Sequence, residues 1–233
     1  MPALDESYPA MSAALADRYG RPELPSAGLD PFEALVATVL DRALDPGKRD
    51  AVVMALRDEG LLEPQALAEA DPVEAEEALR SAGLVINRTA LAPLRRLARW
   101  LVDLHHGSAD ALSGVESGVS AERLREELRT LNGVGPATAD AVLLFALRRP
   151  VYPLDRATYR VLARHGWIDA DAGYDEARDA VERLDPGDPV ALARLSVWFE
   201  KVGREFCRAG APRCERCPLR PFLPESGPVD PNA

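Results

Sequence analysis

The chain has 233 residues and a formal net charge of −10 at pH 7, and 47% of its residues are hydrophobic. This composition is typical of a globular protein, and the chain holds no apolar run of the roughly 20 residues that a membrane span requires. The acidic balance argues against broad adhesion to nucleic acid, although segments 148–164 and 201–220 are rich in arginine. The N-terminal residues lack the basic and then apolar order of a secretory signal, so we expect a cytoplasmic protein.

The elements predicted in chain order are almost all helices. Asp30, Pro31 and Glu33 form the pattern of a helix N-terminus before an apolar run. Asp71 starts a second pattern of this kind, and Gly83 is a suitable residue to end it. No stretch alternates between polar and apolar residues with period two, so the sequence predicts an all-α fold. Further helices are expected at 88–104, 121–131, 136–147, 156–165, 174–184 and 188–206.

A Gly-Val-Gly turn at residues 133–135 joins two of these helices. Its glycines permit backbone angles that a Cβ resists. The helix that begins at Pro136 presents free N–H groups and the positive end of its dipole. Such a turn suits a DNA phosphate, because backbone amides bind any base sequence without a net positive charge. A tight helix–helix turn that binds nothing is the alternative on these residues alone.

Several motifs, in order along the chain, resemble the endonuclease III-like DNA glycosylases of the helix-hairpin-helix-GPD superfamily. The hairpin LNGVGPATADAV is followed by RRPVYPLDRATYRV, which places Asp155 where the family has an aspartate. The motif WFEKVGREFC then precedes the cysteines, and Leu84 lies at the wedge position of a loop that resembles the family's DNA-probing loop. The resemblance implies two helical lobes that bind duplex DNA with damaged or distorted bases.

Three positions depart from the family pattern. Ala137 occupies the place of the lysine whose amine, in bifunctional members, attacks the sugar and leads to strand cleavage. The chain's two lysines, Lys48 and Lys201, lie at no motif position, so we expect no lyase activity by this route. Ala43 replaces the glutamine that fills the gap left by a flipped base, and Leu223 replaces the fourth cysteine of the cluster motif.

The aspartate of the motif, Asp155, is retained, and the resemblance implies a catalytic role for it. A carboxylate beside the sugar C1′ can activate water, or stabilise the positive charge that develops as the base departs. The family's monofunctional members, which lack the lysine, use this chemistry. The run 154–158 also has the pattern of a helix N-cap, so a purely structural aspartate is the alternative.

The three cysteines of the chain, Cys207, Cys214 and Cys217, form a C-x6-C-x2-C run. Spacing this tight indicates a metal or a cluster rather than a disulfide framework. The resemblance implies a [4Fe–4S] cluster with these three cysteine ligands and a fourth ligand that the sequence does not identify. Zinc and a degenerate site without metal are the alternatives.

The expected architecture has two lobes with DNA across the cleft between them. A helical barrel covers 25–135 and ends in the hairpin, residues 1–24 and 136–223 form the cluster lobe with Asp155, and 224–233 are a Pro-rich tail. Two functions remain open: a monofunctional DNA glycosylase of base excision repair, and a catalytically silent protein that binds damaged DNA. In either case we expect a monomer in the cytoplasm, at the nucleoid in a prokaryote. The DNA-binding residues that the resemblance implies are Leu84, Gly133, Val134, Gly135, Ala137, Thr138, Arg208, Arg213 and Arg216.

Overall fold

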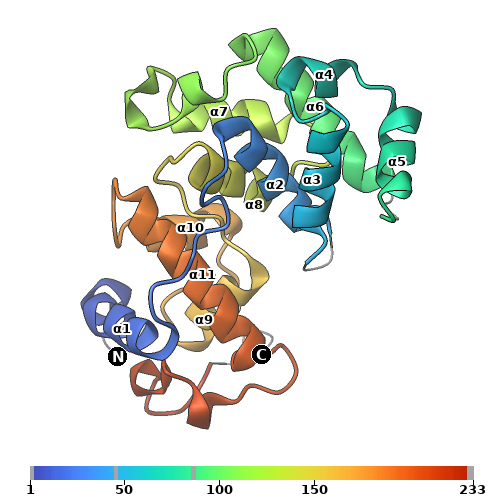
Figure 1. Cartoon of the computed structure of the whole chain (residues 1–233). Coiled ribbons are helices and arrows are strands. Elements are labelled where there is room, and N and C mark those ends of the chain that lie inside the picture. The colour runs from blue at the N-terminus through green and yellow to red at the C-terminus, as the bar shows by residue number, and fades with distance from the viewer. Residues whose placement is uncertain (1–2, 45–46, 85–87, 230–233) are drawn as a thin grey trace. The chain divides into compact units, whose positions relative to one another are not determined.

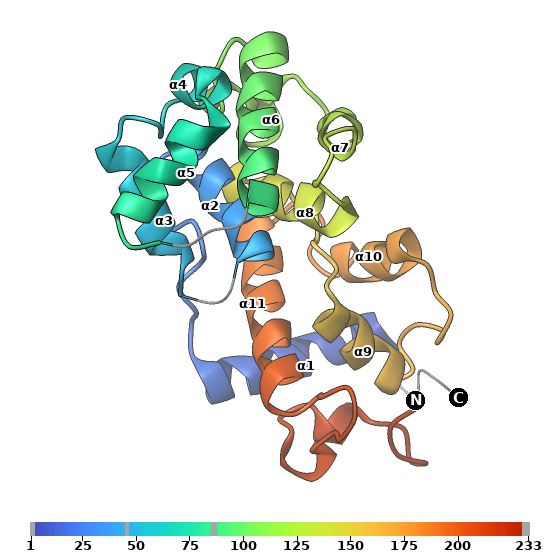
Figure 2. The same cartoon turned by 90° about the vertical axis from the view of Figure 1, so that its right-hand side faces the viewer.

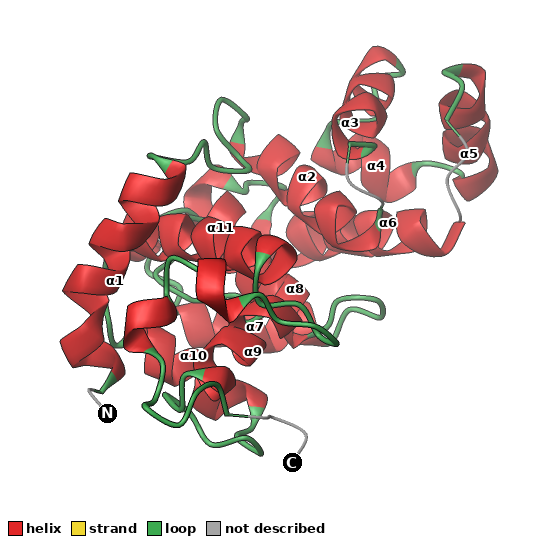
Figure 3. Cartoon of the chain, turned by 90° about the horizontal axis from the view of Figure 1, so that it is seen from below, coloured by secondary structure: helices red, strands yellow, loops and turns green. Residues whose placement is uncertain are grey.

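The computed structural model describes residues 3–44, 47–84 and 88–229. Within these ranges every regular element is a helix, and the remainder is loop (Figure 1, Figure 3). The predicted all-α class is therefore confirmed. No helix in the described ranges is both long and apolar enough to cross a bilayer.

The chain divides into two compact units. One is continuous and consists of residues 25–149, and the other combines residues 1–24 with residues 150–233. Each unit has its own buried apolar residues, so each is stabilised by burial of apolar surface within it.

The continuous unit is arranged around α2. Its helices are α2 (Pro31–Ala43), α3 (Arg49–Asp58), α4 (Pro64–Glu69), α5 (Pro72–Ser81), α6 (Arg88–His105), α7 (Ala121–Arg129) and α8 (Pro136–Ala141). Asp30 caps α2 as predicted, because its side chain accepts hydrogen bonds from the N–H groups of Phe32 (2.8 Å) and Glu33 (3.0 Å). The apolar face of α2 packs against α3, α6 and α8.

The long predicted helix at 88–104 is α6, and its apolar spacing has the expected effect. Leu94, Leu97 and Leu101 are buried, whereas Leu104 is 58% exposed. α6 packs mainly against α4 (Figure 2). Ser120 caps α7 at the predicted position by accepting a hydrogen bond from the N–H of Arg123 (3.2 Å).

The helix predicted at 136–147 changes pitch part-way. α8 is regular, and Val142–Ala146 then continues as a π-helical turn, in which the N–H of Leu147 donates to the carbonyl of Val142 (3.0 Å). This turn packs against α2, which is why residues 136–149 lie in the continuous unit. The sequence-based lobe boundary after residue 135 thus differs from the observed boundary after Arg149.

The second unit is arranged around α11. Its helices are α1 (Leu4–Tyr19), α9 (Arg156–Arg164), α10 (Tyr174–Glu182) and α11 (Pro189–Glu205). α11 contacts both α9 and α1, which crosses it (Figure 2). α11 and α9 lie close together at Gly203, where a Cβ would be only 2.3 Å from the Cβ of Ala157. On the α1 side, Nε1 of Trp198 donates to the carbonyl of Gly20 (3.1 Å).

The segment after the cysteines is irregular, as its proline content predicts. Among its described residues, a short 3-10 helix forms at Arg220–Phe222. Within the expected tail, the N–H of Val229 donates to the carbonyl of Arg164 at 2.9 Å. Residues 224–229 are therefore anchored to the end of α9, and residues 230–233 lie outside the described ranges.

Candidate nucleic-acid interface and cysteine pocket

The Gly-Val-Gly turn requires glycine at its first position. Gly133 has φ +94°, and a Cβ there would lie 2.7 Å from Cγ of Pro93 on α6. Gly135 has an ordinary φ of −81° and nothing within 4 Å of a Cβ position. Val134 buries its side chain, and its N–H donates to the carbonyl of Leu131 (2.9 Å). The turn is thus shaped by Gly133 and Val134, and Gly135 leaves it open to solvent.

Three backbone amides of the hairpin are available to a ligand. In the described part of the chain, the N–H groups of Gly133, Gly135 and Ala137 have no protein acceptor. The two glycines are exposed, and Ala137 is half-buried. By contrast, Val134 and Thr138 already use their N–H groups, the latter to the carbonyl of Gly135 (3.0 Å). Unpaired amides at a helix start can bind an anion through hydrogen bonds.

Two exposed arginines flank the hairpin, and sequence reasoning missed both. Nη2 of Arg42, near the end of α2, lies 3.4 Å from the carbonyl oxygen of Ala137. Nη1 of Arg96, on α6, donates to the carbonyl of Asn132 at 2.8 Å. Arg42 stands alone in its segment, whereas Arg96 belongs to the arginine-containing run 95–99, but no local pattern connects either residue to the hairpin. Together they place two guanidinium groups beside the free amides.

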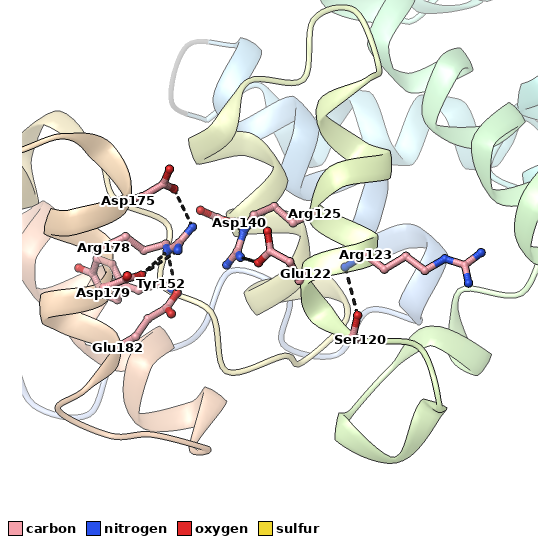
Figure 4. Close-up of polar contacts among 10 residues, drawn as sticks. All are labelled: Ser120, Glu122, Arg123, Arg125, Asp140, Tyr152, Asp175, Arg178, Asp179 and Glu182. Atoms are coloured by element: carbon pink, nitrogen blue, oxygen red, sulfur yellow. Dashed lines mark hydrogen bonds and ion pairs between the residues drawn. The ribbon is translucent and has the colours of Figure 1, made fainter.

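A buried ion pair joins the two helices of the hairpin (Figure 4). Nε of Arg125 on α7 lies 2.7 Å from Oδ1 of Asp140 on α8, and both side chains are buried. Glu122, one turn before Arg125, also contacts the guanidinium. Removing one partner of a buried pair leaves an uncompensated charge and typically costs about 3–5 kcal/mol. The pair therefore holds α7 and α8 in the orientation that shapes the turn.

Asp155 is the N-cap of α9, as the sequence predicts, and it is half-buried. Its Oδ1 accepts a hydrogen bond from the N–H of Thr158 at 2.6 Å. The hydroxyl of Thr158 in turn lies 3.1 Å from the hydroxyl of the buried Tyr152. In the described part of the chain Oδ2 has no protein partner, so this oxygen is available to a water molecule or to a developing positive charge.

The three cysteines share one pocket. Cys207, Cys214 and Cys217 line it together with Leu223, which stands at the position of the missing fourth cysteine, and with His165 from the end of α9. The sequence predicted the cysteines as a group. His165 was missed because it lies on a distant segment, which only the packing of α9 against the cysteine loop brings close.

The donor set of this pocket fits an iron–sulfur cluster. Three thiols are soft ligands suited to iron–sulfur clusters. Burial and repulsion from the neighbouring Cys207 raise the pKa of the Cys214 thiol, and burial raises the pKa of Cys217 to about 11. A positively charged group would favour the thiolates. Among the described residues no three His, Cys, Asp or Glu side chains converge as a single metal ion requires. A [4Fe–4S] cluster imposes no such convergence, because each ligand binds its own iron atom.

The cysteine loop is also held by hydrogen bonds to α9. Nη1 of Arg164 lies 3.4 Å from Sγ of Cys207 and donates to the carbonyl of Arg208 at 2.6 Å. Nε of Arg160 donates to the carbonyl of Cys207 (3.0 Å). Burial lowers the pKa of His165, so its ring is neutral at pH 7. The loop is thus fixed to the helix that Asp155 caps.

The other residues inferred from sequence lie on the surface of their units. Arg208, Arg213 and Arg216 are exposed on the cysteine loop. Leu84 follows α5 and is half-buried, and the rest of its loop, residues 85–87, lies outside the described ranges. Ala43 is the exposed last residue of α2.

Comparison with known proteins connects this geometry to a class of protein. No family model matches the chain. The chain is 28% identical to a provisionally assigned DNA repair glycosylase of Methanocaldococcus jannaschii, over 82% of its own length and 84% of the relative's. It is also 28% identical to endonuclease III of Thermotoga maritima, over 82% and 81% of the two lengths. Over most of its length the chain is therefore similar to endonuclease III.

A solved structure has the same fold. A solved structure of an endonuclease III–DNA non-covalent complex superposes with a TM-score of 0.71, at 24% identity and with 97% of each chain covered. The resemblance inferred from the motifs and the all-α fold class is therefore confirmed. The endonuclease III fold shown by this likeness includes the hairpin and the cysteine segment, since nearly the whole chain is covered.

Proposed function

We propose that this chain binds damaged duplex DNA and hydrolyses the N-glycosidic bond of a damaged base without cutting the strand. The observation that carries the proposal is the hairpin with three unpaired amides, on a chain whose relatives are named as a DNA repair glycosylase and as endonuclease III. Such amides bind phosphates regardless of base sequence. Arg42 and Arg96 beside the turn strengthen this attraction.

Asp155 is the proposed catalytic residue. One of its oxygens caps α9, and the other has no protein partner in the described part of the chain. A carboxylate with one fixed and one available oxygen is oriented without being neutralised. It can therefore activate water, or stabilise the charge on the sugar as the base leaves.

The chain is not expected to cut the strand, because Ala137 stands at the position of the reactive lysine. A methyl group cannot form the Schiff base from which β-elimination proceeds. The product of base release is then an abasic site in an intact strand. Alkali, rather than the protein, would break that strand.

We also propose that Cys207, Cys214 and Cys217 hold a [4Fe–4S] cluster. Their shared pocket and their three soft thiol donors support this. The cluster would fix the loop whose exposed arginines meet DNA phosphates. Anaerobically purified protein should be brown and contain about four iron atoms per chain; a colourless, iron-free preparation would contradict the cluster.

The deciding experiment incubates the anaerobically purified chain with a panel of duplexes, each containing one damaged base. We expect free base from at least one duplex and strand breaks only after alkali treatment. Asp155→Asn should abolish base release and leave DNA affinity within a few-fold. The control is Asp188→Asn, because Asp188 caps α11 by accepting from Val190 and Ala191. Asparagine preserves both caps, so only the Asp155 variant should lose activity.

Two results would overturn parts of this proposal. Strand breaks without alkali would show that the protein is also a lyase. Base release by Asp155→Asn at the wild-type rate would show that the aspartate is only a cap.

A catalytically silent DNA-binding protein is the second candidate. The cap bond of Asp155 favours it, because Oδ1 already has a structural role. This function predicts that the whole panel is bound more tightly than undamaged duplex and that no base is released.

A further inference from the structure

His165 occupies an unusual position for a histidine remote from the cysteines in sequence. It is the C-cap residue of α9, it is buried, and it lines the same pocket as the three cysteines. The ring of Trp167 stacks on it with centroids 4.5 Å apart and an interplanar angle of 17°. The imidazole is therefore held in one orientation within the pocket.

The two ring nitrogens of His165 both face carbonyl oxygens. Nδ1 lies 2.7 Å from the carbonyl of Val161, and Nε2 lies 3.2 Å from the carbonyl of Leu219. A neutral imidazole carries a single N–H and can donate to only one of them. The shorter contact, to Val161, is the better hydrogen bond. With the proton on Nδ1, the lone pair of Nε2 is left facing another acceptor.

The geometry points to His165 as the fourth protein ligand of the cluster, through Nε2. This inference rests on the proposed cluster at Cys207, Cys214 and Cys217. Leu223 at the fourth motif position has no donor atom. Of the described side chains that line the pocket, His165 is the one besides the cysteines that can bind iron. Binding would use the neutral lone pair, so no proton is released from the ring.

The surroundings of His165 match those of histidines that bind metals. Such a histidine usually donates its other ring N–H to a carboxylate or a backbone carbonyl, which fixes the tautomer and the ring plane. Nδ1 and the carbonyl of Val161 form this arrangement here. Iron at Nε2 would require the Leu219 carbonyl, which lies 3.2 Å in front of this nitrogen, to turn aside.

The test examines the cluster directly, in the full chain reconstituted with iron and sulfide without oxygen. Pulsed electron paramagnetic resonance of the reduced wild-type protein should detect hyperfine coupling to ¹⁴N, and labelling histidine with ¹⁵N should change that coupling. His165→Cys should keep the iron content and abolish the coupling. It should also lower the reduction potential, because replacing cysteine by histidine raises it.

Two further variants separate ligation from a structural role. His165→Ala should lose iron faster in air than wild type, and adding Leu223→Cys to it should restore four iron atoms without nitrogen coupling. The matched control is His106→Asn, which replaces an exposed histidine of φ +53° by a residue that tolerates this backbone. Circular dichroism would verify that each variant is folded.

The possible failures are distinguishable. A wild-type chain that binds no iron would overturn the cluster and the histidine ligand together. A cluster of four iron atoms without nitrogen coupling would overturn the ligand alone and leave the cluster in place. An unchanged potential in His165→Cys would have the same meaning.

Discussion

At the scale of single residues, the proposed absence of strand cleavage rests on Ala137. It is half-buried in the first turn of α8, and the guanidinium of Arg42 lies 3.4 Å from its carbonyl oxygen. A lysine at this position would place an amine near a fixed cation. A nearby positive charge lowers the pKa of a lysine and so increases the fraction of neutral, nucleophilic amine.

We therefore expect Ala137→Lys to form a covalent intermediate that wild type does not form. Its amine would attack C1′ of a damaged or abasic nucleotide, and borohydride would reduce the Schiff base to a stable protein–DNA adduct. Denaturing gel electrophoresis measures the adduct.

Ala137→Arg is the control for this prediction, because it adds the positive charge without a reactive amine. An adduct with wild type or with Ala137→Arg would identify another amine as the nucleophile. The absence of an adduct with Ala137→Lys would show that residue 137 does not meet the sugar.

At the scale of elements, the two glycines of the hairpin have different functions. We expect Gly133→Ala to lower the free energy of unfolding by about 1–3 kcal/mol, since φ is +94° and the new Cβ would overlap Pro93. Gly135→Ala, with φ −81° and open space, should change it by no more than about 0.5 kcal/mol. Urea unfolding measures both variants. Equal losses would contradict this account of the turn.

The contact between α9 and α11 depends on Gly203. A Cβ there would lie 2.3 Å from the Cβ of Ala157, so the helices would have to separate. We expect Gly203→Ala to lower the free energy of unfolding by about 1–2 kcal/mol, because overpacking outweighs the gain in helix propensity. Gly210→Ala, with no atom within 4 Å, should be neutral. Thermal unfolding of both variants checks this, and a stable Gly203→Ala would show that the helices adjust freely.

Sequence predicted the helices whose ends carry local signals. Asp30, Ser120 and Asp155 each cap a helix within three residues, so a short pattern reveals them. It did not predict α1, α3 or α4. α1 contains Pro9, α3 starts after Lys48 without a side-chain cap, and α4 has only six residues. These helices are stabilised by packing within their units, which no short pattern encodes.

In the candidate site, too, only the residues that are close together in the sequence were predictable. The cysteines and the hairpin glycines are close in sequence, and their grouping was predictable. His165, Arg42 and Arg96 reach these features from other helices, so only the folded chain identifies them.

At the scale of the whole molecule, the net charge of −10 repels DNA overall. DNA binding must therefore depend on the few surface regions that carry arginines or free amides. We expect each of Arg208→Gln, Arg213→Gln and Arg216→Gln to reduce the slope of log K against log salt concentration by about 0.9, because each would remove one proposed phosphate contact. The loss of affinity should be equal for different base sequences. Fluorescence anisotropy across salt concentrations measures this.

Arg80→Gln serves as the control, because Arg80 is exposed but pairs with Glu76 at 2.8 Å on α5. Its salt slope should equal that of wild type. A slope that no cysteine-loop variant alters would remove this loop from the DNA contact.

The second unit combines residues 1–24 with residues 150–233, so its first helix is synthesised long before the helices on which it packs. α1 buries Met11 and Leu15, and contacts α11, with Arg18 placed 3.4 Å from Glu205. Roughly 170 residues separate these helices, which a ribosome translates in about 10–30 s. During that interval the whole continuous unit emerges, while α1 lacks its partner. The nascent chain thus exposes the apolar residues of α1, among them Met11 and Leu15, until α11 is made, and chaperones that bind such residues can act during this interval.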